Sequence, residues 1–559
     1  MNRHLSSLAV PARVPVVARS GMVATSQPLA TQAGIAALRA GGSAVDAALT
    51  ANAVLAVTEP HMCGPGGDLF ALVWDPVARD LAGLNATGRS PSGLSHAALV
   101  AGLGNRECIP ARGPWTLTTP GAVQGWHALH ARFGKLPWRA LFAPARDIAH
   151  EGFALGVITA GWWRRASEEI LRDPELRDRN AAFQAAFMPN TAPPAAAQWV
   201  KNPGLARLFE ALSEQGAVGF YRGDVARALL RAQQQAGGYL AQTDFDQVSA
   251  DWVTPLTTDY RGFQVSVLPP NGQGLSVLQM LNLLEGFPLA DYSPTDPTWW
   301  HLFIEAKKLV FEDRARYYAD PAYAAIPISA LLDKDYARAR ASLIDPRCAT
   351  TDATPGNVQI PAGDTTYLTV ADREGMQVSL IQSLFNPFGS GIVVPEYGFA
   401  LQSRGAGFTL DPVHPNGYAP GKRPFHTIMP GFVCKHGAPW LSFGAVGGDM
   451  QPQAQVQVLV NLIDFGADVQ RAGDLPRMRH AGGRHPNGLR EAVLGVAHYE
   501  ASFAAATIAE LIRRGHVMAP IRDPFTGFVG GYQGILRDPA SGAYWGASES
   551  RLDGCALGY

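Results

Sequence analysis

The chain has 559 residues, with 46 basic and 47 acidic side chains and a formal net charge of −1. Because 47% of the residues are apolar and only 17% are charged, the chain can bury a sizeable core, which excludes wholesale intrinsic disorder. The balanced charge, without any run of Lys or Arg, argues against a nucleic-acid partner.

The cysteines and the N-terminal segment bear on the compartment. Five cysteines lie far apart without a CxxC pattern, so neither a disulfide framework nor a cysteine zinc site is indicated. Pro11 and Pro15 interrupt the apolar stretch that a signal peptide needs, and no segment approaches the 18 or so apolar residues of a membrane span. We therefore expect a cytoplasmic protein that does not enter a membrane; the alternative is a short leader that this pattern does not reveal. The cysteines are Cys63, Cys108, Cys348, Cys434 and Cys555.

The first ordered stretch predicts two helices and a strand. Residues 28–40 are expected to form a helix that starts near Pro28 and ends at the following glycine pair. Ser43 to Asp46 resembles a capping box for a second helix, which runs to about residue 57. A glycine-rich turn, CGPGGD, then leads into a buried strand at 69–74.

Helical patterns dominate from about residue 125 to 334. Helices are predicted at 124–133, at 140–151 and, with the clearest apolar spacing, at 298–318. The charged side chains of the last helix are expected to form its exposed polar face. They are Glu305, Lys307, Lys308, Asp313 and Arg314.

The character of the sequence changes after a Thr-, Pro- and Gly-rich connection at 345–361. Residues 365–371 and 376–384 alternate as strands do and flank a turn, so residues 365–384 are predicted to form a hairpin. Further strands are expected at 391–394, 427–433 and 440–443, and a helix at 453–465.

The segment Gly363-Asp-Thr-Thr-Tyr367 could carry chemistry at the start of this hairpin. Two adjacent threonines are ordinarily just good strand formers. If the peptide bond before Thr365 were cleaved, however, Thr365 would gain an α-amino group with a reference pKa of about 7.7–8.0. That amine could take the hydroxyl proton and return it later, so one residue would supply both nucleophile and base.

Six motifs, in order along the chain, carry a resemblance to a known family. They are MVATSQPLATQAGIAALRAGGSAVDAAL, EPHMCGPGGD, DTTYLTVADREGMQVSLIQS, FGSGIVVPEYGFALQSRGAGF, GKRPFHTIMPGF and FGAVGGDMQPQAQVQVL. From about residue 21 to the end, the chain resembles the gamma-glutamyltransferase family, whose members are N-terminal-nucleophile hydrolases. The resemblance implies an α+β fold, a four-layered αββα sandwich.

The resemblance also implies the chemical roles of several residues. Thr365 matches the threonine that becomes a new N-terminus and acts as nucleophile, and Ser383 matches a hydroxyl that supports it. Gly447 and Gly448 match the glycine pair whose backbone N–H groups hold the oxyanion. Taken alone, this glycine pair reads as a plain turn.

Substrate-binding residues follow from the same resemblance. Arg89 resembles the arginine that binds the α-carboxylate of the glutamyl group, although the spacing to the following proline is shorter than is typical. Taken alone, Arg89 reads as a surface arginine. His426 and Thr427 stand where a serine pair contacts the same carboxylate, and only Thr427 keeps a hydroxyl.

The segment Arg404-Gly-Ala-Gly-Phe408 departs from the typical pattern. Typical gamma-glutamyltransferases have an acidic pair before this phenylalanine, one of which binds the α-ammonium of the donor; here Ala406 and Gly407 stand instead. Arg404 adds a positive charge. The RGAGF pattern is similar to a side branch that contains oxamate amidohydrolase and some cephalosporin or glutaryl acylases, so the expected substrate is an amide with a carboxylate and without that amine.

Taken together, the resemblance predicts a self-processing amide hydrolase or acyltransferase. It would comprise a helix-rich subunit, 1–364, and a strand-rich subunit, 365–559, that remain associated as a heterodimer. The alternatives are gamma-glutamyl transfer or hydrolysis on glutathione-like donors, and an uncleaved binding protein without enzyme activity.

No cofactor or metal is expected. The glycine-rich CGPGGD and NGQG segments lack the GK[ST] of a phosphate-binding loop. His414, His426 and His436 do not have the spacing of metal ligands.

Overall fold

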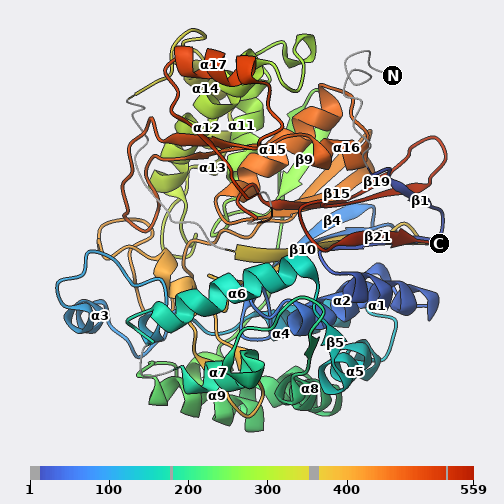
Figure 1. The fold of residues 1–559 in the computed structure, drawn as a ribbon, viewed down its shortest axis with the longest axis vertical. Helices are drawn as coiled ribbons and strands as arrows, with labels where there is room; N and C mark the ends of the chain where they lie inside the picture. Colours follow the sequence, from blue (N-terminus) through green and yellow to red (C-terminus); the bar gives the residue numbers. More distant parts are fainter. Residues whose placement is uncertain (1–12, 177–179, 352–363, 524, 526) are drawn as a thin grey trace.

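The computed structural model describes residues 13–176, 180–351, 364–523, 525 and 527–559. Two seven-stranded antiparallel sheets lie face to face, with helices covering both outer faces (Figure 1). The first sheet has the order β1 (Val16–Ala18), β20 (Tyr544–Ser548), β19 (Gly531–Arg537), β15 (Ala438–Val446), β14 (Gly431–Lys435), β9 (Phe263–Val267) and β8 (Leu256–Tyr260). The second has the order β21 (Cys555–Gly558), β2 (Gly21–Thr25), β10 (Asp364–Asp372), β11 (Gln377–Phe385), β3 (Asp68–Asp75), β4 (Asp80–Ala86) and β7 (Asp251–Val253).

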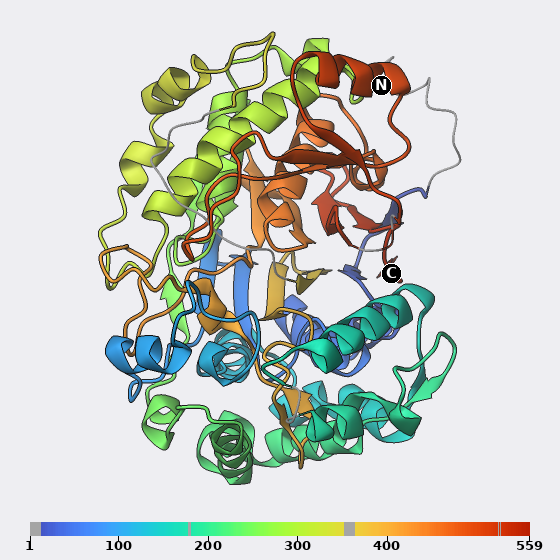
Figure 2. The ribbon, with the colours of Figure 1, turned by 60° about the vertical axis from the view of Figure 1, so that its left-hand side comes forward.

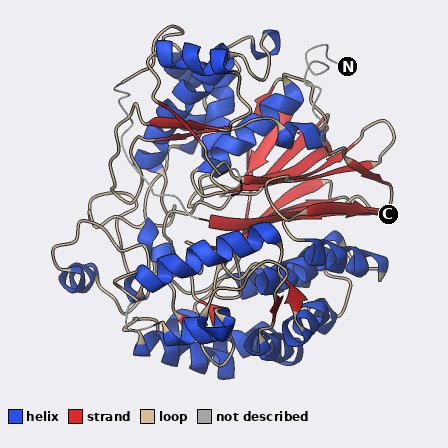
Figure 3. Ribbon diagram, in the orientation of Figure 1, coloured by secondary structure: helices blue, strands red, loops and turns tan. Residues whose placement is uncertain are grey.

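The helices divide into two layers, one on each sheet (Figure 3). The layer on the second sheet includes α1 (Pro28–Arg39), α2 (Ala44–Thr58), α4 (Ala122–Phe133), α5 (Ala143–Glu151), α6 (Val157–Arg172), α7 (Ala181–Phe187), α8 (Pro203–Arg222) and α9 (Asp224–Gln235). The layer on the first sheet includes α11 (Leu275–Leu284), α12 (Pro297–Tyr317), α14 (Lys334–Ala341), α15 (Met450–Ile463), α16 (Val469–Asp474) and α17 (Ala505–Arg513). Short helices α3 (His96–Leu103), α10 (Gln242–Asp246) and α13 (Ile328–Leu332) complete the set.

Apolar side chains fill three interfaces of this sandwich. One core lies between the second sheet and the helices that cover it, and another lies between the first sheet and the helices that cover it. Between the sheets, Phe70, Tyr367, Ile381 and Phe432 belong to a third cluster. A strand buried on both faces needs apolar residues on both sides, which explains the near-continuous apolar run of β3. The predicted αββα sandwich is confirmed.

Most of the predicted elements lie where the sequence places them. The capping box of α2 forms through Ser43 and Asp46, and β10 and β11 form the predicted hairpin. The helix predicted from residue 140 begins later, at Ala143, because residues 138–141 form a 3-10 turn. The strand predicted at 427–433 begins only at Gly431, and residues 352–361 of the predicted connection lie outside the described residues.

The prediction of an exposed polar face on the 298–318 helix is wrong. In α12 the charged side chains are buried with partners, since residues on every face of the helix are buried. The helix packs against α11 and α17 in its layer (Figure 2). Lys308 Nζ lies 2.7 Å from Glu305 Oε1, and Arg314 Nη1 lies 2.9 Å from Asp449 Oδ1. Such side chains are buried only when they are paired, so the charge pattern of this helix reflects internal ion pairs.

Three small sheets lie outside the two main ones in the ranges that the structure describes. Strands β16 (Met478–Ala481), β17 (Val496–Tyr499) and β18 (Met518–Pro520) form a three-stranded sheet. Two-stranded pairs join β12 (Val393–Val394) to β13 (Phe399–Ala400) and β5 (Phe153–Ala154) to β6 (Trp199–Val200). All five cysteines are free. Within the described ranges, none of the helices combines the length and apolarity that crossing a bilayer requires.

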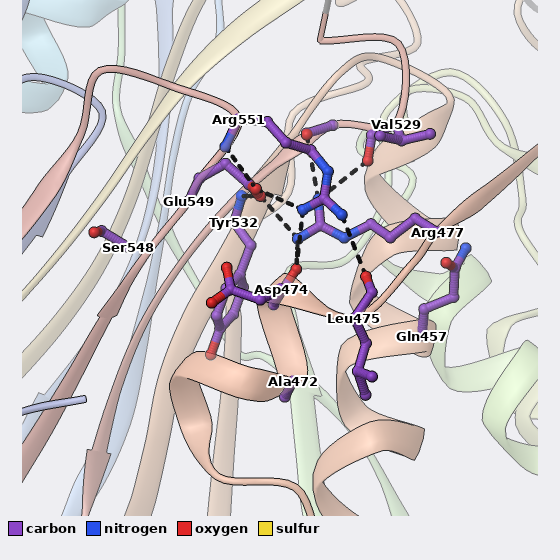
Figure 4. Close-up of polar contacts among 12 residues, drawn as sticks. Gln457, Ala472, Asp474, Leu475, Arg477, Val529, Tyr532, Ser548, Glu549 and Arg551 are labelled. Atoms are coloured by element: carbon purple, nitrogen blue, oxygen red, sulfur yellow. Dashed lines mark hydrogen bonds and ion pairs between the residues drawn. The ribbon is translucent and has the colours of Figure 1, made fainter. Parts of the chain in front are cut away.

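A buried ion-pair network joins the C-terminal strands to the loop after α16 (Figure 4). Arg477 Nη2 lies 2.8 Å from Glu549 Oε2, and Arg551 Nη1 lies 2.7 Å from Glu549 Oε1. Arg551 also pairs with Glu500 at 2.6 Å. The two guanidinium groups hold the pKa of Glu549 at about 2 despite its burial, so this carboxylate is charged at neutral pH.

Glu549→Gln should lower the free energy of unfolding by about 3–5 kcal/mol, because it leaves the buried Arg477 without its carboxylate partner and removes one of the two partners of Arg551. The pKa of Glu549 is lowered by folding, so this stabilisation is present above the ordinary value of 4.5 and is lost as the pH falls toward 2. Urea unfolding at pH 7 and pH 4 measures both effects. Glu168→Gln, which removes an exposed pair with Arg172, is the matched control and should change little. An equal effect of the two variants would contradict the prediction.

Candidate active site

Thr365 lies near the start of β10, fully buried between the sheets. The register of β10 against β11 shifts between residues 364 and 366, an irregularity of the kind that re-aims a side chain. Its Oγ1 accepts a hydrogen bond from Gln451 Nε2 at 3.0 Å and lies 3.5 Å from Ser383 Oγ on the neighbouring strand. Two hydroxyls and an amide therefore meet where the sequence predicts the nucleophile.

Arg404 connects this hydroxyl pair to Thr427. It lies in the 3-10 turn η5 (Arg404–Gly407) and is 1% exposed. Its Nη2 donates to Ser383 Oγ at 2.7 Å and its Nη1 donates to Thr427 Oγ1 at 2.8 Å. Its Nε is buried and has no hydrogen-bond partner among the described residues.

Burial lowers the pKa of Arg404 to about 9, against the attraction of Asp68, so the guanidinium is still cationic at neutral pH. The site thus contains a buried positive charge and one N–H donor, Arg404 Nε, without a hydrogen-bond partner among the described residues. A carboxylate would satisfy both.

His426 is a neutral group in this site. Its Nε2 lies 3.0 Å from Asp68 Oδ2, and burial together with the charge of Arg404 lowers its pKa to about 3. A neutral imidazole that donates from Nε2 to this carboxylate presents Nδ1 as an acceptor. Nδ1 is buried and has no partner among the described residues.

The turn Gly447-Gly448 joins β15 to α15 at the same place. Their φ angles of +114° and +57° lie in the region that favours glycine, and a Cβ at Gly447 would approach Gly530 Cα to 3.1 Å. Gln451, in the first turn of α15, contacts Thr365. The N-terminus of α15, where backbone N–H groups point outward, therefore abuts the candidate nucleophile.

Arg89 lies apart from this cluster. It is about one-third exposed, donates to Gly421 O at 3.1 Å and lies 3.6 Å from Asp320 Oδ2. It lines a small pocket with Ser249 and Arg423, whereas Thr365 lines another small pocket. The structure therefore brings together all the predicted site residues except Arg89.

The pocket beside Thr365 contains acidic groups that the sequence analysis did not identify. Glu59 Oε2 accepts from Ser26 Oγ at 2.6 Å and from Thr366 Oγ1 at 3.1 Å, and Asp553 lines the same pocket. Burial raises the pKa of Glu59 to about 7. A carboxyl group that titrates near neutral pH thus lies next to the candidate nucleophile.

Two other features do not join this site. A cavity of about 560 Å³ is lined by Trp74, Arg132 and Trp252 and contains none of the predicted site residues. In the described part of the chain, the ligand atoms of His301, Glu305 and His516 lie close enough together for a metal ion. These atoms already contact each other or Lys308, whose ammonium lies where it would repel a cation.

Comparisons with known proteins decide the family. The model of the gamma-glutamyltranspeptidase family matches residues 30–559. This chain belongs to the gamma-glutamyltranspeptidase family. Family membership makes the chain an enzyme, with hydrolase or acyltransferase activity, and argues against the alternative of a binding protein without activity.

Individual family members are similar over nearly the whole chain. The glutathione hydrolase-like YwrD proenzyme of Bacillus subtilis (strain 168) is 34% identical over 97% of this chain and 99% of its own. The oxamate amidohydrolase proenzyme of Klebsiella pneumoniae is 33% identical over the same shares. The crystal structure of cephalosporin acylase from Bacillus halodurans is 38% identical, with a TM-score of 0.90, and covers 99% of this chain and 98% of its own.

Three further residues shape the site without having been predicted from the sequence: Asp68, Gln273 and Gln451. Asp68 ends the CGPGGD turn and holds His426, and Gln451 contacts Thr365 directly. The signal for Asp68 and Gln273 was their place in glycine-rich turns that lack the GK[ST] of a phosphate-binding loop. Gln451 lies within the FGAVGGDMQPQAQVQVL motif, but its residue type alone does not indicate a contact with Thr365.

Proposed function

We propose that this enzyme cleaves itself between Asp364 and Thr365 and then uses Thr365 as an N-terminal nucleophile on an amide. The observation that carries the proposal is the contact set of Thr365 Oγ1, with Gln451 at 3.0 Å and Ser383 at 3.5 Å. A buried hydroxyl needs one hydrogen-bond partner, and the second polar group beside Oγ1 goes beyond that need.

The reaction follows from these groups. The freed α-amine of Thr365 takes the hydroxyl proton while Oγ1 attacks the amide carbonyl. The backbone N–H groups of Gly447 and Gly448 stabilise the negative oxygen that forms. The proton then passes to the leaving amine, and water, or an amine acceptor, releases the acyl group from Thr365.

We propose an acyl group that carries a carboxylate and no α-amine. The buried cation of Arg404 and its Nε, which has no partner among the described residues, suit a carboxylate. An ammonium group, in contrast, would find no acidic side chain at Ala406 or Gly407. The similarity to an oxamate amidohydrolase and a cephalosporin acylase is consistent with this class. Arg89 would contribute only by reorienting from its present partners.

A gamma-glutamyl compound is the second candidate substrate. The similarity to the glutathione hydrolase-like YwrD proenzyme favours it. The neutral His426 also favours it, since its Nδ1 acceptor could bind an ammonium in place of the missing acid.

The site of self-cleavage is tested by N-terminal sequencing. The purified protein should separate under denaturing conditions into fragments 1–364 and 365–559, and the smaller should begin Thr-Thr-Tyr-Leu. Under native conditions they should stay together as a heterodimer, because both main sheets contain strands from both fragments. Any other start to the smaller fragment would remove Thr365 as nucleophile.

A further inference from the structure

The NGQG segment, residues 271–274, connects β9 to α11 and places one amide side chain behind the active site. Gln273 is fully buried. Its Nε2 donates to Thr427 O at 2.6 Å and to Gly448 O at 2.8 Å. One side chain thus joins the glycine turn of the proposed oxyanion site to the segment whose hydroxyl binds Arg404.

Arg314 of α12 fixes the orientation of this amide. Its Nη1 donates to Gln273 Oε1 at 2.6 Å and to Asp449 Oδ1 at 2.9 Å. Because a guanidinium can only donate, the other end of the amide must be the NH₂ group, with both hydrogens directed at the two carbonyls. Asp449 follows Gly448, so Arg314 holds the glycine turn both directly and through Gln273.

We propose that Gln273 is a positioning residue, which sets the Gly447-Gly448 turn relative to Thr427 and Arg404. The inference rests on the proposed function of that turn. The hydrogen bond to Gly448 O fixes the orientation of the peptide group between Gly448 and Asp449, and so of the turn. This matters because N–H donors stabilise an oxyanion only when they already point at its position. The side chain touches no substrate and acts through backbone atoms, so its loss should affect the rate more than binding.

The test uses Gln273→Met and Gln273→Glu in the full-length protein. Methionine keeps the length of the side chain and removes all three hydrogen bonds. Glutamate keeps an acceptor for Arg314 and turns an oxygen toward the carbonyls of Thr427 and Gly448, which repel it. Each variant should lower kcat by about ten- to a hundredfold, with KM within about threefold of wild type.

Gln457→Met is the matched control. Gln457 is an equally buried glutamine of α15, and it bonds the backbone of Met478 at 2.8 and 3.3 Å, away from the glycine turn. It should lose a similar amount of thermal stability and keep its kcat. Rates are expressed per molecule of cleaved enzyme, so slower self-cleavage does not count as slower turnover.

Three results would overturn the assignment. They are a kcat within threefold of wild type for both Gln273 variants, a loss of kcat in Gln457→Met equal to theirs, or a change confined to KM. If one Gln273 variant does not fold, the other still decides. If the proposed function itself is wrong, the result is different: Thr365→Ala would still be cleaved or would still hydrolyse the substrate at a rate near that of wild type.

Discussion

Thr365→Ala should leave the protein as a single chain of 559 residues without amide-cleaving activity. The hydroxyl is required twice, once to attack the peptide bond before residue 365 and once to attack the substrate. Loss of a covalent nucleophile removes a factor of about 10⁴ or more in kcat, whereas the surrounding donors alone give only residual catalysis. A denaturing gel and a p-nitroanilide assay measure the two effects.

Thr365→Ser and Thr366→Ala are the controls for this loss. Serine keeps a hydroxyl and should retain part of both reactions. The hydroxyl of Thr366 contacts Glu59 instead of Ser383, so Thr366→Ala should still be cleaved and active. Two bands for Thr365→Ala, or an unprocessed Thr366→Ala with an intact Thr365, would show that the nucleophile lies elsewhere.

The sequence predicted best those parts of the fold that depend on neighbouring residues. The capping box at Ser43 and the hairpin of β10 and β11 each follow from contacts within a short stretch of chain. The cluster of Thr365, Ser383, Arg404 and Thr427 was reached through family motifs, and hydrogen bonds connect these residues in the structure.

Long-range polar contacts could not be predicted in the same way. Helix α12 carries charges at positions that would suit an exposed face, yet tertiary packing buries them against residues far along the chain. Arg314, for example, binds Gln273 and Asp449, which lie 41 and 135 residues away. Periodicity indicates which residues share a face, and it does not indicate whether another layer covers that face.

The wild-type enzyme should prefer glutaryl-p-nitroanilide to γ-glutamyl-p-nitroanilide. The two donors differ only in the α-amine, which would bring an ammonium toward the buried cation of Arg404 with no acid at Ala406 or Gly407. A charge-assisted contact is worth about 1.5–3 kcal/mol, so the preference in kcat/KM should be roughly ten- to a hundredfold. A wild type that favours the γ-glutamyl compound would indicate that another group, such as His426 Nδ1, binds the ammonium.

Gly407→Asp should shift this preference back toward the γ-glutamyl donor by restoring an acid. The packing is tight, since a Cβ at Gly407 would lie 2.9 Å from Phe425 O, so part of any loss in rate will be steric. Gly407→Ala introduces the same Cβ contact without the charge and is therefore the reference. The ratio of kcat/KM for the two donors should change at least tenfold between Gly407→Ala and Gly407→Asp. Equal ratios would mean that a carboxylate at this position does not reach the amine, and that the donor preference is set elsewhere in the pocket.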